Sequence, residues 1–304
     1  MNRMPTHDDI NKILSARTKI AVIGDLIIDE YRYGNVGRIS PEAPVMILNQ
    51  TDVKLVMGGA GNVYQNLKSL GADVTLFCNY PDDELRIWSQ KDSVFANAYP
   101  CARKVRMVSG NHQLLRVDVE TPYNQIEWHQ FNNFSWWREL TENIEWFDVI
   151  VLSDYSKGVL SDGVINTILD LAQMANRPVI VDAKRDLSRY DSPQVIIKCN
   201  REEWNSHKFD TKNIKGLIIT NGEKGITVIH KNNVETFHGL PVSIVDVCGA
   251  GDTVTAVLAI GVSIGMYLFN AANVANYAAA EVCRHPGVVP ITPEGLMLSY
   301  ETTE

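Results

Sequence analysis

Short runs of β-branched and other apolar residues recur along the chain, and helical periodicity follows several of them. Apolar runs without polar alternation are typical of strands buried on both faces, as in a parallel sheet. We expect such strands at residues 20–23, 74–77, 149–152, 179–181, 195–197 and 217–220. The helical period is clearest at residues 62–70 and 162–175. Strands alternating with helices predict an α/β fold around a mostly parallel sheet, with ligands at the carboxyl ends of the strands.

Two segments break this alternation. Residues 31–57 and 103–118 follow predicted strands but are extended, alternating and partly polar, with no helical period. The second segment contains KVRMVSGNHQLLRVD (104–118), which predicts a hairpin that turns at SGN (109–111). Together the two segments predict a small β-sheet lid that stands off the main sheet. An ordinary edge hairpin of the large sheet is the alternative.

The last part of the chain is helical in pattern. The helical period begins at Val247, and residues 253–266 are apolar almost all round, which predicts a buried helix. No fixed-period repeat and no low-complexity linker interrupts the sequence. We therefore expect one continuous domain over residues 1–304.

Composition narrows the function classes. The formal charge of −8 argues against a nucleic-acid-binding surface, which usually needs a basic face. Five scattered cysteines without a C-x-x-C pair and seven histidines without H-x-x-x-H spacing give no pattern for a disulfide framework or a transition-metal site. The N-terminal segment 1–19 lacks the apolar core of a signal peptide, and the longest apolar run, 254–266, is too short to span a bilayer. We expect a cytoplasmic protein that binds neither nucleic acid nor membrane.

One glycine-rich stretch suggests catalysis. DVCGAGDTV (246–254) places Gly249, Ala250 and Gly251 where the buried helix starts, with Asp252 next. Backbone N–H groups at a helix N-terminus stabilise anions, and preorganised donors of this kind suit a phosphoryl group in transfer. Asp252 could then take the proton from an attacking hydroxyl. From these residues alone, a simple helix N-terminus with an acidic first turn is the alternative.

A second glycine-rich stretch, MGGAGNV (57–63), opens a helix. The chain contains no G-x-x-x-x-G-K-[ST] sequence and no G-x-G-x-x-G after its first strand. Because residues 57–63 follow the lid segment and not a core strand, they suit a sugar or its phosphate better than a dinucleotide. Gly58, Gly59 and Asn62 are thus candidate substrate-binding residues, although Asn62 could also be an N-cap.

These motifs resemble the ribokinase-like family of carbohydrate kinases. DVCGAGD resembles its D-T-x-G-A-G-D signature, and GGAGN (58–62) resembles its G-G-x-x-N. TNGEKG (220–225) is similar to its T-x-G-x-x-G nucleotide loop, and NREE (200–203) matches the N-x-x-E element that organises magnesium. The signature Thr is Val247 here, a change that leaves the glycine turn intact. The resemblance implies a three-layer α/β/α sandwich with a β-sheet lid, and a phosphotransferase that uses ATP and Mg²⁺.

Three further motifs point to one branch of that family. GRISPEAPV (37–45), NHQLLRVD (111–118) and LSDYSKG (152–158) look like the heptose 7-phosphate kinase branch. The resemblance implies phosphorylation of the anomeric hydroxyl of D-glycero-D-manno-heptose 7-phosphate to the 1,7-bisphosphate, a step toward ADP-heptose and lipopolysaccharide. The branch often carries a nucleotidyltransferase domain, which we do not expect within residues 1–304, so a separate downstream nucleotidyltransferase is expected. The usual G-x-D-x-x-G reads NYPDDEL (79–85), a departure near the sugar pocket.

The resemblance also assigns roles to single residues. Asp25, at the end of the first strand, would hold sugar hydroxyls. Other substrate-binding candidates are Arg38, Gln113, Arg116, Asp118, Lys157 and Lys184, whose cations would bind a sugar phosphate. Nucleotide-binding roles are implied for Asn200, Thr220, Gly222, Gly225 and Asn276. Asn200 and Glu203 would act on hydrated Mg²⁺, and Asp246 would help to bind a monovalent cation such as K⁺.

The lid also predicts self-association. Its unpaired strand edges are aggregation liabilities unless another surface covers them. Two lids related by a twofold axis would cover each other, so we expect a homodimer. Two alternatives to the heptose interpretation stay open: another sugar or nucleoside kinase of the same fold, and a non-catalytic sugar-phosphate sensor.

Overall fold

A computed structural model describes residues 4–79, 93–97, 101–120 and 136–302. Nine strands form one sheet in the order β13-β12-β11-β10-β9-β8-β1-β4-β5. The strands are parallel from β11 to β5, and β12 and β13 add an antiparallel edge. Their bounds are β1 Lys19–Gly24, β4 Asp73–Asn79, β5 Val94–Asn97, β8 Val149–Asp154, β9 Val179–Ala183, β10 Val195–Asn200, β11 Gly216–Thr220, β12 Ile226–His230 and β13 Asn233–Phe237. All six predicted strands belong to this sheet, which confirms the α/β prediction.

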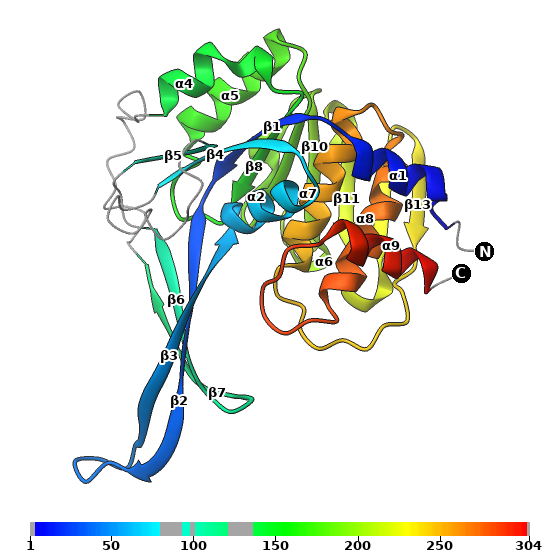
Figure 1. The fold of residues 1–304 in the computed structure, drawn as a ribbon. Coiled ribbons are helices and arrows are strands. Elements are labelled where there is room, and N and C mark those ends of the chain that lie inside the picture. The colour runs from blue at the N-terminus through cyan, green and yellow to red at the C-terminus, as the bar shows by residue number, and fades with distance from the viewer. Residues whose placement is uncertain (1–3, 80–92, 98–100, 121–135, 303–304) are drawn as a thin grey trace.

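Helices cover both faces of the sheet, as Figure 1 shows. One layer contains α1 His7–Ser15, α2 Ala60–Ser69, α7 Ala250–Ser263, α8 Leu268–Val282 and α9 Pro293–Glu301. The other contains α4 Trp137–Glu142, α5 Asp162–Met174 and the short α6 Arg201–Ser206. Alternate residues of β1 explain the two layers, because Ile20 and Val22 join one apolar cluster and Ala21 and Ile23 join the other.

Short 3₁₀ turns complete the connections. They are η4 Ile144–Trp146, η5 Leu187–Tyr190, η6 Thr211–Asn213 and η7 Gly222–Lys224. Helix α7, predicted over 253–266, is buried along most of its length but lies about one turn earlier in the chain. Within the described residues, no helix is both long enough and apolar enough to cross a membrane.

A second sheet of four strands projects from one end of the sandwich (Figure 1). Its order is β3-β2-β6-β7, with bounds β2 Leu26–Ile39, β3 Met46–Gly59, β6 Ala102–Ser109 and β7 His112–Val119. This separate sheet confirms the predicted lid, and β6 and β7 turn where the SGN sequence predicts. The lid begins at Leu26, five residues earlier than predicted, because β2 continues almost directly from β1.

The two faces of the lid differ in chemistry. Directly paired residues share a face of a sheet, so the register sorts the side chains. One face is polar and carries Asp29, Tyr31, Lys54, Lys104, Arg106, Arg116 and Asp118. The other face is largely apolar and carries Val53, Leu55, Val105, Met107, Leu115 and Val117, together with Glu30 and Arg32.

Candidate active site

The glycine turn lies at the start of α7, and its backbone requires glycine. Gly249 has a φ of +82°, and a Cβ at this position would lie 2.6 Å from Nδ2 of Asn62. Helix α7 begins at Ala250, so the N–H groups of its first turn have no carbonyl partner within the helix. Asp252 belongs to this turn and is only 5% exposed. A buried carboxylate beside an anion-binding turn is what proton abstraction during phosphoryl transfer would use.

Helix α2 holds one side of the Asp252 carboxylate. Asn62 donates a hydrogen bond from Nδ2 to Asp252 Oδ2, over 2.8 Å. A second contact joins the same helices, because Thr253 Oγ1 donates to Asn66 Oδ1 over 3.0 Å. The N-cap of α2 is Gly59 and Asn62 is the third residue of the helix, so the N-cap interpretation of Asn62 is wrong. Its amide instead links the MGGAGNV segment (57–63) to the glycine turn and Asp252, which together are called the catalytic turn below.

The loop after β8 holds the other side. Tyr155 donates its hydroxyl to Asp252 Oδ1 over 2.7 Å, so both carboxylate oxygens accept a hydrogen bond. Burial and the neighbouring Asp182 raise the pKa of Asp252 above its ordinary range, and the hydrogen bond from Asn62, the charge of Lys198 and the hydrogen bond from Tyr155 act in the opposite direction. The carboxylate is therefore poised as a base that takes up protons more readily than an exposed Asp.

Asp25 directly follows the last residue of β1, as predicted, and its carboxylate holds the loop after β8. It is fully buried, and its carboxylate accepts hydrogen bonds from three backbone N–H groups, those of Tyr155, Lys157 and Val159, each over 2.9 Å. Burial and the charge of Asp154 nevertheless raise the pKa of Asp25 to about 6. Asp25 thus organises the loop after β8, and direct contact with sugar hydroxyls stays a prediction.

The sequence GDLIID (24–29) contains a second carboxylate, Asp29, which lies at the root of the lid. Asp29 is buried on the polar face of β2 and forms an ion pair with Arg106 of β6. The Arg106 guanidinium also lies 5.1 Å from the centre of the Tyr31 ring. Tyr31 in turn reaches Gly287, whose N–H donates to Asp246 beside the glycine turn. The polar face of the lid therefore faces the catalytic turn.

A network of opposite charges lies beneath the glycine turn. Lys198, 2% exposed on β10, forms an ion pair with Asp182 of β9 over 2.6 Å, and a Cβ at Gly251 would lie 2.9 Å from its Nζ. Lys184 bridges Asp182 over 3.1 Å and Glu203 over 3.0 Å. Burial opposes ionisation of Asp182, but Lys184 and Lys198 outweigh it and lower the pKa to about 2. This network puts two ammonium groups beside the site where a phosphoryl group would sit.

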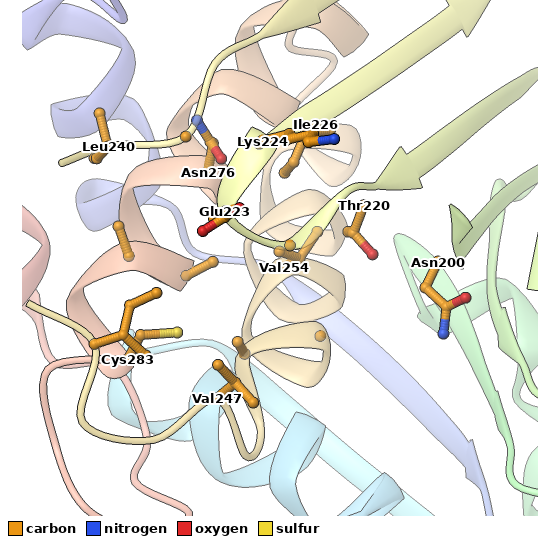
Figure 2. Close-up of a pocket in the computed structure, with 18 of the residues that line it drawn as sticks. Asn200, Thr220, Glu223, Lys224, Ile226, Leu240, Val247, Val254, Asn276 and Cys283 are labelled. Atoms are coloured by element: carbon orange, nitrogen blue, oxygen red, sulfur yellow. The ribbon is translucent and has the colours of Figure 1, made fainter. Parts of the chain in front are cut away.

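A pocket of about 790 Å³ borders both the glycine turn and this charge network, because Lys184 and Lys198 are among its lining residues. Figure 2 shows side chains from β10, the β11–β12 turn, α7 and α8 around it. The residues predicted to bind the nucleotide all line it, namely Asn200, Thr220, Gly222, Gly225 and Asn276. Ala250 and Gly251 line the same pocket, so the first turn of α7 closes one end of it.

The predicted magnesium residues form a helix cap next to this pocket. Asn200 is the N-cap of α6, and its Oδ1 accepts the Glu203 N–H over 2.8 Å while Glu203 Oε2 accepts the Asn200 N–H over 2.7 Å. This reciprocal cap does not exclude the metal role. Both side chains offer oxygen atoms at the carboxyl end of β10, the donor type that Mg²⁺ prefers, and contact through water fits their existing hydrogen bonds.

The predicted substrate cations do not all meet. Arg38 lies near the tip of the lid, nine residues further along β2 than Asp29, which is roughly 30 Å of extended strand. Lys157 pairs with Glu120 over 2.6 Å, and Arg116 pairs with Asp118 on the polar lid face over 2.8 Å. Gln113 is exposed at the hairpin end of β7. Within one chain, Arg38 and Gln113 therefore lie away from the catalytic turn.

Asp246 precedes the glycine turn and accepts two backbone hydrogen bonds. Its Oδ1 accepts the Cys248 N–H and its Oδ2 accepts the Gly287 N–H, both over 3.0 Å. Burial opposes ionisation, but these donors lower the pKa of Asp246. The carboxylate is thus anionic and contacts Gly287, and the binding of a monovalent cation beside it stays a prediction.

The sequence pattern described as pfkB family carbohydrate kinase matches residues 17–294. This chain belongs to that family. It is therefore a sugar kinase, a phosphotransferase that acts on an alcohol group, and the family assignment made from the four motifs is confirmed. Kinases of this family use ATP and Mg²⁺.

Two relatives of moderate sequence identity to this chain carry the same name, bifunctional protein HldE. The bifunctional protein HldE of Pelobacter propionicus is 34% identical over 96% of this chain, and that of Trichlorobacter lovleyi is 35% identical over 90%. This chain covers 65% and 61% of those two proteins, respectively, so it spans under two thirds of the relatives that it matches.

Solved structures share the fold at low identity. Phosphofructokinase-2 from Escherichia coli in complex with potassium has a TM-score of 0.71 at 14% identity, and the match covers 95% of this chain and 99% of that one. Arabidopsis thaliana ribokinase complexed with ribose and ATP has a TM-score of 0.68 at 15% identity, with 94% and 99% covered. These likenesses confirm the ribokinase-like sandwich with its lid.

The sequence reasoning missed several residues of this kinase site. Asp29 forms an ion pair with Arg106 at the root of the lid, and Tyr155, Asp182 and Lys198 lie at the catalytic turn. Lys198 interrupts the apolar run VIIKCN, and a charge inside a buried strand is itself a signal that the side chain has a specific partner. Asp182 and Tyr155 stand at the carboxyl ends of predicted strands, where ligands bind in α/β sheets.

Proposed function

We propose that this kinase transfers the γ-phosphoryl group of ATP to the anomeric hydroxyl of D-glycero-D-manno-heptose 7-phosphate and forms the 1,7-bisphosphate. The position of Asp252 carries the proposal, because it directly follows Ala250 and Gly251, which line the pocket of the nucleotide motifs, and its carboxylate accepts a hydrogen bond from Asn62 of the GGAGN motif. The choice of sugar rests on the RISPEAPV, QLLR and DYSKG sequences, which resemble the heptose 7-phosphate kinase branch.

In the proposed reaction, the sugar hydroxyl oxygen attacks the γ-phosphorus. The proton of that hydroxyl passes to Asp252, the bond to the β-phosphate oxygen breaks, and ADP leaves. The N–H groups at the start of α7 stabilise charge on the transferring phosphoryl oxygens, and Lys198 contributes positive potential from below. Bound Mg²⁺ would neutralise phosphate charge, and Asn200 and Glu203 would hold it through water.

A phosphorylated sugar suits the charges around the site. Arg106 and Arg116 lie on the polar face of the lid, and Lys157 and Lys184 lie at the ends of β8 and β9. Each of these four cations has an acidic partner in the ligand-free protein. A sugar phosphate would exchange one such partner for charge-assisted hydrogen bonds to the ligand.

A substrate panel tests the choice of sugar. We expect kcat/KM for heptose 7-phosphate to exceed that for free heptose, ribose, fructose 6-phosphate and nucleosides by about 10² or more, because compounds without a phosphate cannot form its charge-assisted hydrogen bonds and the lid motifs resemble those of heptose 7-phosphate kinases and not those of other sugar kinases. A coupled assay of ADP release measures this. Fastest turnover with a nucleoside or an unphosphorylated sugar would contradict the substrate assignment and leave the kinase family assignment intact.

Two additional proposals concern partners. Phosphofructokinase-2 binds potassium in its solved structure, and we propose that Asp246 supports a K⁺ site here. We also propose a homodimer through the lid. Potassium dependence of ADP release, with sodium as the control, tests the first of these.

A further inference from the structure

The loop after β8 holds a tyrosine against the catalytic carboxylate. Tyr155 donates its hydroxyl to Asp252 Oδ1 over 2.7 Å, opposite the Asn62 amide at Oδ2. We infer that Tyr155 is a positioning residue for Asp252, which fixes the orientation of the carboxylate and favours its ionised form. The inference rests on the proposed role of Asp252 as the base that accepts the sugar proton.

The tyrosine is itself held in place from several directions. Its backbone N–H donates to Asp25, which also accepts the N–H groups of Lys157 and Val159. The Lys184 ammonium lies 5.4 Å from the centre of the tyrosine ring. A loop bound at three points to one buried carboxylate leaves the hydroxyl little freedom to choose another acceptor.

The backbone conformation of Ser156, the next residue, also supports a fixed position of Tyr155. Ser156 has a φ of +57°, which is uncommon for a residue with a side chain. Its N–H donates to Asp154 Oδ1 over 2.9 Å, and Asp154 is fully buried with Arg185 and Tyr190 as further partners. Such a conformation persists where the surroundings determine it, so the position of Tyr155 is built into the fold.

The charges around Asp252 explain why a donor is needed there. Asp182 on β9 raises its pKa together with burial, whereas Asn62 on α2, Lys198 on β10 and the Tyr155 hydroxyl lower it. Burial raises the pKa of Tyr155 well above its ordinary value, so its hydroxyl keeps its proton and acts as a donor. A base must be ionised before it accepts a proton, and Tyr155 shifts Asp252 toward that state.

Tyr155→Phe tests the inference, because it removes the hydroxyl and keeps the ring. We expect the acidic limb of the kcat–pH profile to move up by roughly one to two pH units, the effect of losing a hydrogen bond to a charged group. On that limb kcat falls about 10- to 100-fold, and at alkaline pH it recovers in part, while KM for the sugar changes less than about threefold. A raised KM with an unchanged pH profile would make Tyr155 a substrate ligand and overturn the inference.

A measurement without substrate separates this inference from the proposed function. The carboxyl ¹³C resonance of Asp252, assigned with Asp252→Asn, is titrated in the wild-type protein and in Tyr155→Phe. We expect its pKa to rise in the variant, even if no sugar of the panel is phosphorylated. An Asp252 titration that overlays the wild type would overturn the inference, whatever the activity.

Two further variants complete the test. Tyr64→Phe is the matched control, because Tyr64 is also a buried tyrosine but its hydroxyl forms a hydrogen bond with Ser93, and we expect this variant to leave the Asp252 titration unchanged. Should Tyr155→Phe fail to fold, fluorotyrosine at position 155 keeps the size of the ring and makes the hydroxyl a stronger donor. The acidic limb then moves to lower pH, and an unchanged limb would contradict the inference.

Discussion

The two ends of this kinase site are built in different ways. At the phosphoryl-transfer end, Asp252 and Lys198 are buried among the carboxyl ends of parallel strands, and both have their polar partners without any ligand. At the sugar end, a four-stranded lid offers a polar face to the site and an apolar face on its other side, where Leu115 is 57% and Val117 is 41% exposed. The chemistry is therefore preorganised by the core, whereas the substrate end depends on a sheet whose apolar face is exposed at Leu115 and Val117 among the described residues.

Removal of the base should produce the largest effect of those expected at the core end. In Asp252→Asn we expect kcat to fall by roughly 10² to 10⁴, because the amide cannot accept the sugar proton. Binding of ATP and sugar should persist, since Asn preserves the shape and the hydrogen bond with Asn62. Steady-state ADP release and isothermal titration with each ligand measure the two quantities. A kcat near that of wild type at saturation would reduce Asp252 to an acidic residue in the first turn of a helix.

A charge on the apolar lid face should instead change association. We expect Val117→Asp to weaken the proposed homodimer by roughly thirtyfold or more, because it buries an unpaired charge among apolar side chains and costs about as much as the loss of an interface hot spot. The ATP affinity of Val117→Asp should equal that of the wild type, because Val117 lies on the lid and does not line the nucleotide pocket. Light scattering over a dilution series measures the oligomeric state.

The control for the lid variant is Val234→Asp. Val234 is 65% exposed on the antiparallel edge strand β13, so the same substitution is made there on the main sheet. We expect it to leave the dimer intact. A wild-type protein that is monomeric at all concentrations tested would exclude the dimer, and equal effects of the two variants would show that the lid face is not the interface.

The same contrast explains what the sequence could predict. The motifs of the core end are local, and their order and spacing are enough to group DVCGAGD, TNGEKG and NREE around one pocket. The six buried strands were predicted from continuous apolar runs. Strands β12 and β13 were not predicted, because polar residues such as Thr227 and Glu235 interrupt their apolar runs.

At the lid end, the contacts that position the side chains join residues that are far apart in the sequence. GDLIID contains two carboxylates, and its sequence does not show that Asp25 accepts N–H groups from residues 155–159 while Asp29 faces Arg106. The position of Arg38 depends on how far the β2–β3 pairing continues, and that length follows from register and not from local composition. Side chains within about one helical turn of a motif were predictable, and those placed by sheet register were not.

The smallest effect that we expect is a change in the magnesium dependence of the reaction, caused by a substitution beside the nucleotide pocket. In Glu203→Gln we expect the half-saturating Mg²⁺ concentration to rise about tenfold, the low end of the range for residues that hold a metal through a second shell, with KM for the sugar unchanged. Gln keeps the reciprocal hydrogen bonds of the helix cap but loses the charge that orders hydrated Mg²⁺ and the ion pair with Lys184. Glu202→Gln makes the same charge change on an exposed residue in the same turn and should leave the titration unmoved. ADP release measured against Mg²⁺ at fixed ATP gives both curves; if the Glu203→Gln curve overlays that of wild type, the carboxylate serves the helix cap and Lys184 alone.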